Sequence, residues 1–576
     1  MQQRIALSQR DIDPETGKFK SREIPDPKNP KQKITVSGEE YAKMLIRAEL
    51  EKNPDLKVIM IWHESAPGYG IPEELLNMEI PAIAENQKIY GQFITEVERI
   101  IHQFPGLKIQ IGNSSASIGA VVVPMRAGAN PAAYDYVGIE TPSQVIPPEK
   151  LQECGLQGMQ ITQDVAEYYA KRNVDLNGCY EFVYRCERDI GEQQQAEWYM
   201  RDILICLAHD FQLISPGIFV DCRNGYYNGL WGGSGIIFRK PYIYPKRAYA
   251  AYAALTNVFD QVRFKRQIPT GSTTVYALEF ERKDKKMASA LWAARGSVDF
   301  EVSFKDNARV RVFDMYGREQ TMSGKNITVR GGTAPVYLLT DKEIQAVNLK
   351  NRAFPKDDAR GKVSKLVSAM DSMDLVEVKA DPRAETTHTR FLPIMKPGNF
   401  TVKQVNDEQM GECLEVALDL SSDPYKSKYI TEYTTIRLKD PVIVPGDPVG
   451  LGVWVKGNSS WGTIRFEIED AKGEIFKNLS PFGWGCDVMD WQGNLSLNFD
   501  GWNMVSHHLV PSKIFLEKSP GAVSEQWASE GGDKKIDFPI KVRAVTVGIN
   551  RHKLNLKDFE VSDPVIRIKN IVGLEE

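Results

Sequence analysis

The strongest constraint on the fold is a change of pattern near residue 262. Before that point, short apolar runs rich in β-branched and aromatic residues alternate with longer stretches of helical periodicity, as in parallel α/β proteins. The apolar runs are VIMIW (58–62), KIQIG (108–112), YDYVGIE (134–140), YEFVYRCE (180–187) and ISPGIFVDC (214–222). The helical stretches span 37–56, 86–104, 160–173, 192–211 and 246–262. This alternation predicts an α/β TIM-type barrel.

The start of this region is short for a complete barrel. Ser37 and Glu40 stand at capping-box spacing and mark the start of the first helix, followed by the apolar positions Tyr41, Met44 and Leu45. Residues 1–36 are polar and contain several prolines, so residues 1–57 leave no room for the earlier strand-helix units of a barrel. We therefore expect a partial (β/α)8 barrel over 1–262 that lacks its N-terminal strands.

Beyond residue 262 the apolar residues alternate at period two and turn residues separate the runs. Segments such as VDFEVSF and ARVRVF predict a small antiparallel β-sandwich over 268–345. Residues 346–395 are rich in charge, and we expect a linker there with one helix over 359–373. Short strands with Gly, Asn and Asp turns return over 396–576 and predict a larger jelly-roll β-sandwich.

Composition excludes several classes of partner. The 576 residues carry a net charge of −4, from 72 basic and 76 acidic side chains, which gives no electrostatic reason to expect nucleic acid. No apolar run approaches the roughly 20 residues of a membrane span. The 7 cysteines form no CxxC pair, so neither a disulfide framework nor a metal site is expected. The first 20 residues contain no apolar segment of the kind found in signal peptides.

Polar residues at the ends of the predicted strands are the candidates for chemistry. Active sites of parallel barrels lie at the carboxyl ends of the strands. The residues at those ends are His63, Glu64, Asn113, Glu140, Glu187 and Asp221. Two carboxylates facing each other are what glycoside hydrolysis requires, one to protonate the leaving oxygen and one to stabilise the sugar cation or attack it.

Three stretches resemble one known family. VIMIWHES (58–65), YRCERDIGEQQQAEWYMRDILICLAHD (184–210) and WGGSGIIFRKPYIYPKRAYAAYAAL (231–255) are similar to strands 4, 7 and 8, with their loops and helices, in the clan of retaining (β/α)8-barrel glycoside hydrolases. The resemblance implies Glu64 as the acid/base and Glu187 as the nucleophile. His63 stands where the family has Asn and would bind the sugar 2-hydroxyl.

Other residues are expected to contact the substrate or only to support the fold. Trp62, Asn113, Glu140, Asp221 and Trp231 are the candidate substrate contacts of the barrel. Glu64 could instead be a polar strand end, and Glu187 an ion-pair partner of Arg185 or Arg188. Asp221 could equally pair with Arg223, and Trp231 could simply be packed in the core.

The last domain has a tryptophan cluster. Trp454, Trp461, Trp484, Trp491, Trp502 and Trp527 fall within its sequence, and aromatic faces stack on the C–H faces of sugars. Trp484 and Trp491 stand in a loop-like segment and are the candidate sugar contacts, whereas Trp454 and Trp502 stand in strand patterns and are expected in the core. GVWVKG and DGWN resemble galactose-binding-like β-sandwiches, which implies carbohydrate binding.

The leading prediction is an extracellular or periplasmic glycoside hydrolase that cleaves a β-linked polysaccharide or oligosaccharide with retention, without a metal or organic cofactor. Two alternatives stay open at this point. One is a catalytically inactive carbohydrate-binding protein, which His63 and Arg188 favour, and the other is a structural surface or adhesion protein. The oligomeric state does not follow from the sequence.

Overall fold

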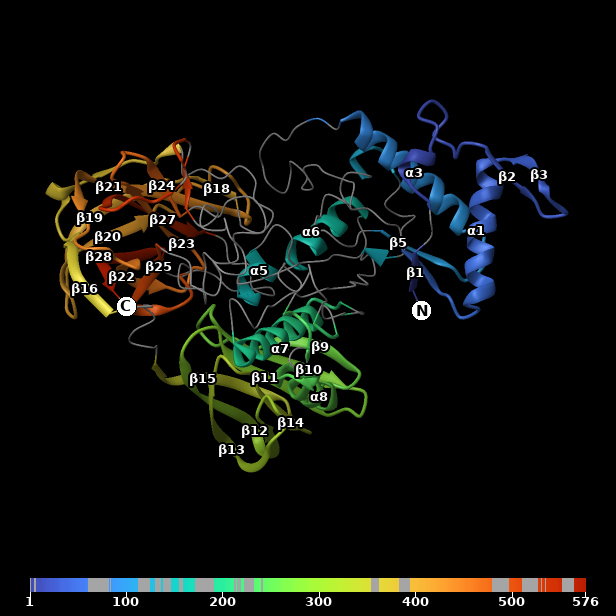
Figure 1. Ribbon diagram of the computed structural model, residues 1–576. Helices are drawn as coiled ribbons and strands as arrows, with labels where there is room; N and C mark the ends of the chain where they lie inside the picture. Colours follow the sequence, from blue (N-terminus) through green and yellow to red (C-terminus); the bar gives the residue numbers. More distant parts are fainter. Residues whose placement is uncertain are drawn as a thin grey trace. The chain divides into compact units, whose positions relative to one another are not determined.

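The chain forms two compact units in a computed structural model (Figure 1). Unit 1 contains residues 1–142, 157–182 and 210–216, and unit 2 contains 143–156, 183–209 and 217–576. The structure describes residues 2–4, 7–60, 82, 84–111, 125–129, 136–137, 147–154, 159–170, 191–211, 214, 219–221, 233–239, 242–353, 362–382, 394–478, 497–509, 527–529, 531–533, 535–551 and 564–575.

Unit 1 is built on a parallel sheet. Its strands are β1 (Gln2–Arg4), β4 (Val58–Met60), β5 (Lys108–Ile111) and β6 (Tyr136–Val137), in the order β1-β4-β5-β6. Every neighbouring pair is parallel, so all carboxyl ends lie at one edge of the sheet. The strands expected at 58–62, 108–112 and 134–140 are thus confirmed over their described residues as adjacent parallel strands. A closed barrel is not seen among the described residues and stays a prediction.

The start of unit 1 differs from expectation, because residues 1–36 do contain strands. β1 pairs with β4, and β2 (Arg22–Asp26) forms an antiparallel hairpin with β3 (Asn29–Val36) after the short 3-10 helix η1 (Gln9–Asp11). These strands could not be predicted from an apolar pattern, because their residues are largely polar. β3 is exposed along most of its length, and β1 consists of Gln-Gln-Arg. An exposed strand has no apolar face for a sequence pattern to reveal.

The helices of unit 1 follow the predicted periodicity. They are α1 (Gly38–Lys52), α3 (Glu85–Ile101) and α6 (Met159–Ala170). The Ser37 side chain accepts a hydrogen bond from the Glu40 amide at 3.2 Å, which caps α1 as its sequence indicates. In α3 the buried residues Tyr90, Phe93, Val97 and Ile100 recur at the spacing of one helix face.

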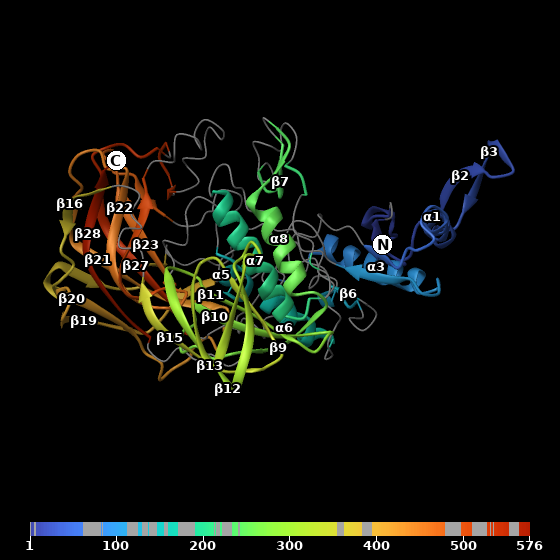
Figure 2. The same cartoon turned by 90° about the horizontal axis from the view of Figure 1, so that it is seen from below.

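The helical part of unit 2 consists of α5 (Pro148–Cys154), α7 (Glu192–Ala208) and α8 (Arg247–Val258), with the small hairpin β7 (Ile237–Phe238) and β8 (Tyr244–Pro245). α7 and α8 pack side by side (Figures 1 and 2). The rings of Tyr199 and Tyr252 meet between them with centroids 6.1 Å apart. Both helices were expected from the sequence, whereas α5 was not.

The first β-sandwich is one antiparallel sheet that folds over itself. Its strands are β9 (Val262–Gln267), β10 (Val275–Arg282), β11 (Met287–Ala293), β12 (Ser297–Phe313), β13 (Glu319–Gly332), β14 (Val336–Thr340) and β15 (Ile344–Ala353). The long strand β12 joins both layers, since Ser297–Phe304 pairs with β15 and Arg311–Phe313 with β14. Val298, Phe300 and Val302 alternate into the core, as the period-two pattern predicts.

The second β-sandwich consists of two sheets around a separate core. Sheet F contains β16 (Lys362–Ser368), β19 (Phe400–Asp407), β20 (Gly411–Leu418), β22 (Gly450–Asn458), β25 (Asp500–His508) and β28 (Val565–Glu575). Sheet G contains β17 (Val376–Val378), β18 (Ile394–Pro397), β21 (Ile430–Ile443), β23 (Thr463–Glu469), β24 (Ile475–Lys477), β26 (Ala528–Ser529) and β27 (Lys541–Asn550). Val453 and Val455 of sheet F and Val545 and Val547 of sheet G belong to the shared apolar core.

The expected linker over 346–395 with a helix at 359–373 is wrong. β15 continues the first sandwich to Ala353, β16 pairs with β28, and η4 (Met373–Leu375) and β17 follow. The Lys, Ser, Leu and Ala residues of the segment gave a helical pattern. Pairing with β28 and burial of Val367 in the core override this weak local preference.

Candidate functional site

The predicted catalytic residues follow the ends of the parallel strands but lie outside the described residues. β4 ends at Met60, β5 at Ile111 and β6 at Val137. In the sequence, Glu64 follows the first of these ends by four residues, Asn113 the second by two, and Glu140 the third by three. The other predicted residues outside the description are Trp62, His63, Glu187, Trp231, Trp484 and Trp491. All of these assignments stay predictions.

Asp221 is the predicted site residue that the structure describes, and it is buried in an ion pair. Its Oδ1 accepts hydrogen bonds from Lys246 Nζ at 2.6 Å and from the Gly235 amide at 2.9 Å. Both charged side chains are 0% exposed. Next to Asp221, Val220 forms a parallel bridge with Ile237, so this part of the strand expected at 214–222 lies beside β7.

A glycine is required beside this ion pair. A Cβ on Gly235 would stand 2.4 Å from the Asp221 amide nitrogen, too close for any side chain. Lys246 Nζ also donates to the Gly233 carbonyl at 2.9 Å, so the pair fixes both ends of the Gly233–Lys246 segment. Asp221 therefore anchors the backbone here, and its predicted contact with substrate stays a prediction.

Helix α7 also holds this segment. Tyr199 Oη donates to the Ser234 carbonyl at 2.5 Å, and Gln195 Nε2 donates to the Gly233 carbonyl at 3.0 Å. The stretch WGGSG, which resembles the strand-8 loop of the glycosidase clan, is thus fixed from Gly233 onward by buried hydrogen bonds. Trp231 precedes this fixed part by two residues.

A second buried ion pair was missed by the sequence reasoning. Arg201 of α7 binds Glu149 of α5 through two parallel bonds, Nε to Oε1 and Nη2 to Oε2, each 2.7 Å. Trp292 Nε1 of β11 also donates to Glu149 Oε1 at 2.7 Å. Its indole stacks on Tyr276 with ring centroids 4.6 Å apart. A signal existed, because Arg201 and Asp202 interrupt an apolar run from Trp198 to Ala208 and buried charges are nearly always paired.

This cluster joins the helical part of unit 2 to the first sandwich and is structural. Tyr276 Oη extends it by a bond to Glu153 Oε2 at 3.2 Å, and His209 Nε2 stands 3.8 Å from Glu153 Oε1. The ion pair between Arg201 and Glu149 is fully withdrawn from solvent, with side chains 1% and 0% exposed. A group sealed in this way holds elements together and cannot reach a polymeric substrate.

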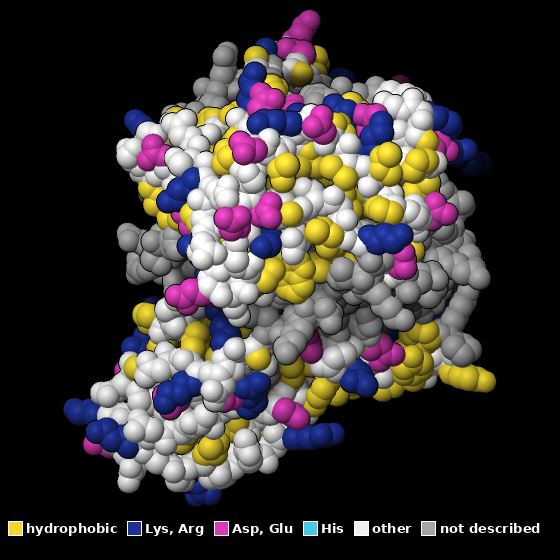
Figure 3. Space-filling model, turned by 90° about the vertical axis from the view of Figure 1, so that its left-hand side faces the viewer, with side chains coloured by type: hydrophobic (Ala, Val, Ile, Leu, Met, Phe, Trp, Pro, Cys, Tyr) yellow, Lys and Arg dark blue, Asp and Glu magenta, His cyan; other side chains and the backbone are white. Residues whose placement is uncertain are grey.

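The outer face of sheet F carries two tryptophans, Trp454 and Trp502, both of which were predicted to be in the core. Trp454 pairs with Met504, and Lys456 pairs with Trp502, so the two indoles project from the same face and lie diagonally. Both are half-buried. Trp454 nevertheless packs against the buried side chains of Met504, Val572 and Leu574 on its own face. The main core between the sheets receives Val453 and Val455 instead, because VWV is apolar on both sides of the strand. Figure 3, viewed from the side of β16, β19 and β20, shows hydrophobic side chains among charged ones on the second sandwich.

Asp407 fixes one of these indoles. Its Oδ1 accepts from Trp502 Nε1 at 2.9 Å, and its Oδ2 accepts from Lys456 Nζ at 2.8 Å and from Arg567 Nη1 at 2.6 Å. Burial alone would raise the pKa of this carboxyl, but these hydrogen bonds outweigh it and hold the pKa well below its usual range. Trp502 is therefore held by an ionised carboxylate.

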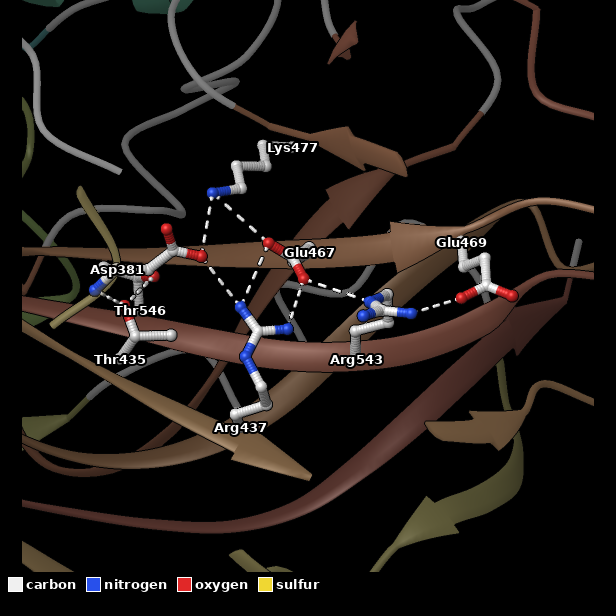
Figure 4. A network of polar contacts seen from close by, with 8 residues as sticks. All are labelled: Asp381, Thr435, Arg437, Glu467, Glu469, Lys477, Arg543 and Thr546. Atoms are coloured by element: carbon white, nitrogen blue, oxygen red, sulfur yellow. Dashed lines mark hydrogen bonds and ion pairs between the residues drawn. The ribbon is translucent and has the colours of Figure 1, made fainter. Parts of the chain in front are cut away.

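The outer face of sheet G is polar and charged (Figure 4). Arg437 binds Glu467 at 2.5 Å and Asp381 at 2.8 Å. Lys477 contacts the same two carboxylates at 3.2 and 3.4 Å, and Arg543 bridges Glu467 to Glu469. Burial by itself would raise the pKa of Glu467, yet the bonds and charges of Arg437 and Lys477 lower it below its usual value. Each carboxylate of this network is thus paired with at least one cation.

Two searches of the described residues were negative. No group of three or more His, Cys, Asp or Glu side chains within them has the arrangement of a metal site. No described helix is long and apolar enough to cross a membrane.

No protein-family model matches the sequence, and neither does any curated protein. Solved structures similar to this chain include glycoside hydrolases and carbohydrate-binding modules. A family 39 glycoside hydrolase from Bacteroides cellulosilyticus WH2 is 15% identical with a TM-score of 0.41, over 52% of this chain and 61% of that one. The GH30 xylanase C of Talaromyces cellulolyticus is 9% identical with a TM-score of 0.34, over 52% and 67%.

A family 11 carbohydrate-binding module from a Clostridium thermocellum cellulase is 10% identical with a TM-score of 0.20, and the match covers 37% of this chain and 96% of the module. The chain spans about three fifths of the length of the family 39 enzyme. Likeness at these values assigns neither a fold family nor an activity, so the functional argument rests on the residues of this chain.

Proposed function

We propose that this chain is a glycoside hydrolase that cleaves a β-linked polysaccharide or oligosaccharide with retention of configuration. The observation that carries the proposal is the order of the parallel sheet in unit 1. β4, β5 and β6 are adjacent and parallel, and the sequence supplies Glu64, Asn113 and Glu140 just after their carboxyl ends. Active sites of parallel α/β folds are built at that edge.

In the proposed mechanism the two carboxyl groups have different tasks. Glu187 attacks the anomeric carbon while Glu64 protonates the departing glycosidic oxygen, and a covalent glycosyl ester forms. Glu64, now ionised, takes a proton from water, the water oxygen attacks the same carbon, and Glu187 leaves as a carboxylate. Two displacements at one carbon retain its configuration. His63 stands next to Glu64 in the sequence, and in this mechanism its side chain binds the sugar 2-hydroxyl.

The test is hydrolysis by the full chain and by two variants. Release of reducing ends is measured on a panel of aryl glycosides and β-linked polysaccharides. Glu64→Gln and Glu187→Gln should each lower the rate by about 10²–10⁴-fold, because each removes one catalytic carboxylate. Glu51→Gln, an exposed residue of α1, is the matched control and should leave the rate unchanged. Equal rates for all four proteins would overturn the proposal.

A second candidate function is carbohydrate binding without catalysis, and the exposed parts of Trp454 and Trp502 on sheet F favour it. Half-buried indoles on a flat sheet face can stack on sugar rings. In affinity electrophoresis against the same polysaccharides, Trp454→Ala should weaken retardation. Ile443→Ala, which removes an exposed apolar side chain from sheet G, should not. Binding that persists in a chain with no hydrolysis would select this candidate.

A further inference from the structure

The outer face of sheet F carries more cations than carboxylates between β19 and β25. Because the core residues alternate with them along each strand, the charged side chains of this face project away from the core. The four cations are Lys403, Lys456, Arg567 and Lys569, and the two carboxylates are Asp407 and Glu415. At the margin of the face, Asp500 is paired with Arg352 of the first sandwich. The face therefore has an excess of positive charge.

Solvent reaches these cations. The side chains of Lys403, Lys456 and Arg567 are 60%, 40% and 27% exposed. The two indoles on the same face, Trp454 and Trp502, are half-buried, so each also has surface open to water. A ligand that lies on this face can therefore touch charge and indole surface at once, without any opening of the fold.

Each indole has a lysine beside it. Trp502 of β25 pairs in register with Lys456 of β22, and Trp454 of β22 pairs in register with Lys569 of β28. Side chains directly opposite each other on one face of an antiparallel pair are neighbours, with Cβ atoms about 4.5–5.5 Å apart. The face therefore repeats one arrangement, an indole next to an ammonium group, at two neighbouring places.

The two carboxylates neutralise only part of this charge. Asp407 accepts hydrogen bonds from Lys456 and Arg567, and Glu415 is bound by Arg567 at 2.9 Å and by Lys403 at 3.1 Å. Lys569 forms no ion pair with a carboxylate in the described part of the chain, and its Nζ donates to the Met410 carbonyl at 2.5 Å. The cation beside Trp454 is thus held by a neutral group and keeps its full charge for a ligand.

The combination of indoles and lysines indicates the class of ligand. Indole faces stack on the C–H faces of sugar rings, and ammonium groups bind carboxylates or sulfate esters. A glycan with an anionic group on its sugar residues meets both requirements. A nucleic acid also stacks on indoles but binds through a strongly basic surface, whereas this chain has a net charge of −4 and Asp407 and Glu415 lie within the face.

We propose that the outer face of sheet F binds an acidic polysaccharide, whose sugar rings stack on Trp454 and Trp502 and whose anionic groups bind Lys569 and Lys456. This inference rests on the carbohydrate binding proposed above as the second candidate function and adds the class of glycan. It requires no chemistry, so it can be measured separately from hydrolysis.

The experiment measures binding by calorimetry with the full chain carrying Glu64→Gln, so that no probe is consumed. The probes are alginate and polygalacturonate oligosaccharides, which carry carboxylates, and carrageenan oligosaccharides, which carry sulfate esters. The carboxyl-reduced and desulfated oligomers serve as neutral counterparts. At least one acidic oligomer should bind, its neutral counterpart should bind about tenfold more weakly, and the affinity for the acidic oligomer should fall as the salt concentration rises.

Four variants separate charge from stacking. Lys456→Met with Lys569→Met should abolish the preference for the acidic oligomer and leave the affinity for its neutral counterpart unchanged. Lys305→Met with Lys325→Met, which replaces two exposed lysines of the first sandwich, is the matched control and should preserve the preference. Lys456→Arg with Lys569→Arg keeps both charges and should retain the preference, which guards against a folding defect. Trp454→Ala should weaken the binding of acidic and neutral oligomers alike, because it removes a stacking surface.

The outcomes distinguish this inference from the functions on which it rests. Equal binding of acidic and neutral oligomers, or a preference that survives in the folded double methionine variant, would overturn the inference and leave carbohydrate binding intact. Absence of binding to every oligomer would refute both. Tighter binding of a single-stranded DNA oligonucleotide than of any acidic oligomer would also overturn the inference. Hydrolysis is tested with other variants, so its loss would leave the acidic preference standing.

Discussion

Two buried arginines of this molecule have opposite surroundings. Arg201, between α5 and α7, is bound through two parallel 2.7 Å bonds to Glu149, which Trp292 also contacts. Arg465, on the outer face of sheet G, is nearly as buried but has no carboxylate partner among the described residues. The first guanidinium meets its charge requirement within the fold and the second does not. Burial alone therefore does not tell whether a guanidinium is neutralised within the fold, whereas the presence of a carboxylate partner does.

The largest expected effect is the loss of the Arg201 pair. Arg201→Met leaves Glu149 buried without its cation and should lower the free energy of unfolding by about 3–5 kcal/mol. Chemical denaturation of unit 2 measures this loss. The exposed pair of Arg311 and Glu319 has the same two-bond geometry at 2.7 Å, so Arg311→Met is the matched control and should change the midpoint little.

A double variant separates charge from packing at this position. Arg201→Met with Glu149→Met replaces the pair by apolar side chains of similar volume and should recover most of the lost stability. A double variant as unstable as the single one would mean that Arg201 acts through shape and not through its partner.

The same substitution at Arg465 should have the opposite sign and a smaller size. Arg465→Met removes a buried charge that no described carboxylate compensates, so the free energy of unfolding should stay the same or rise by about 1 kcal/mol. Thermal unfolding of both methionine variants side by side tests this directly. A loss at Arg465 as large as that at Arg201 would contradict the contrast between the two sites.

The smallest effect is expected at an arginine in partial contact with water. Arg99 of α3 binds Glu39 of α1, and the bonds from Lys43 and Arg99 lower the pKa of Glu39 to about 2. Because the folded pKa lies below the unfolded value of 4.5, the stabilisation is present above pH 4.5 and is lost as the pH falls toward 2.

Glu39 is 37% exposed, so solvent screening limits the effect of Glu39→Gln to less than about 1 kcal/mol at pH 7. The difference between wild type and variant, from urea unfolding at a series of pH values, should disappear near pH 2. Glu51→Gln on the same helix is the control, because Glu51 forms no ion pair within the described part of the chain. A difference that grows as the pH falls would have the wrong sign for this pair.

The sequence predicted those elements whose signal is local. The helix that begins after Ser37 and the strand with alternating Val298, Phe300 and Val302 were foreseen because a cap and a period-two pattern are written in neighbouring residues. The strand β16 was not, because its stability comes from β28, some 200 residues away in sequence. Local pattern cannot reveal a distant pairing partner.

The site could be predicted only as a set of strand ends. Asp221 was recognised as a candidate, but its partner Lys246 was not, since the pair is made by tertiary packing across 25 residues of sequence. Arg465 gave no signal at all, because an arginine between two core residues looks like any outward-facing position of a strand. Arg465 is unusual because no described carboxylate pairs with it, and only a structure can show the absence of such a partner.

The central claim is that this chain hydrolyses a glycan through Glu64 and Glu187 with retention. The most direct measurement is proton NMR of the anomer that is first released during hydrolysis of a β-linked aryl glycoside or oligosaccharide. The account predicts that the β anomer appears first, that the α anomer follows only by mutarotation, and that Glu187→Gln forms product about 10²–10⁴-fold more slowly. Release of the α anomer first, or hydrolysis undiminished in Glu187→Gln, would contradict it.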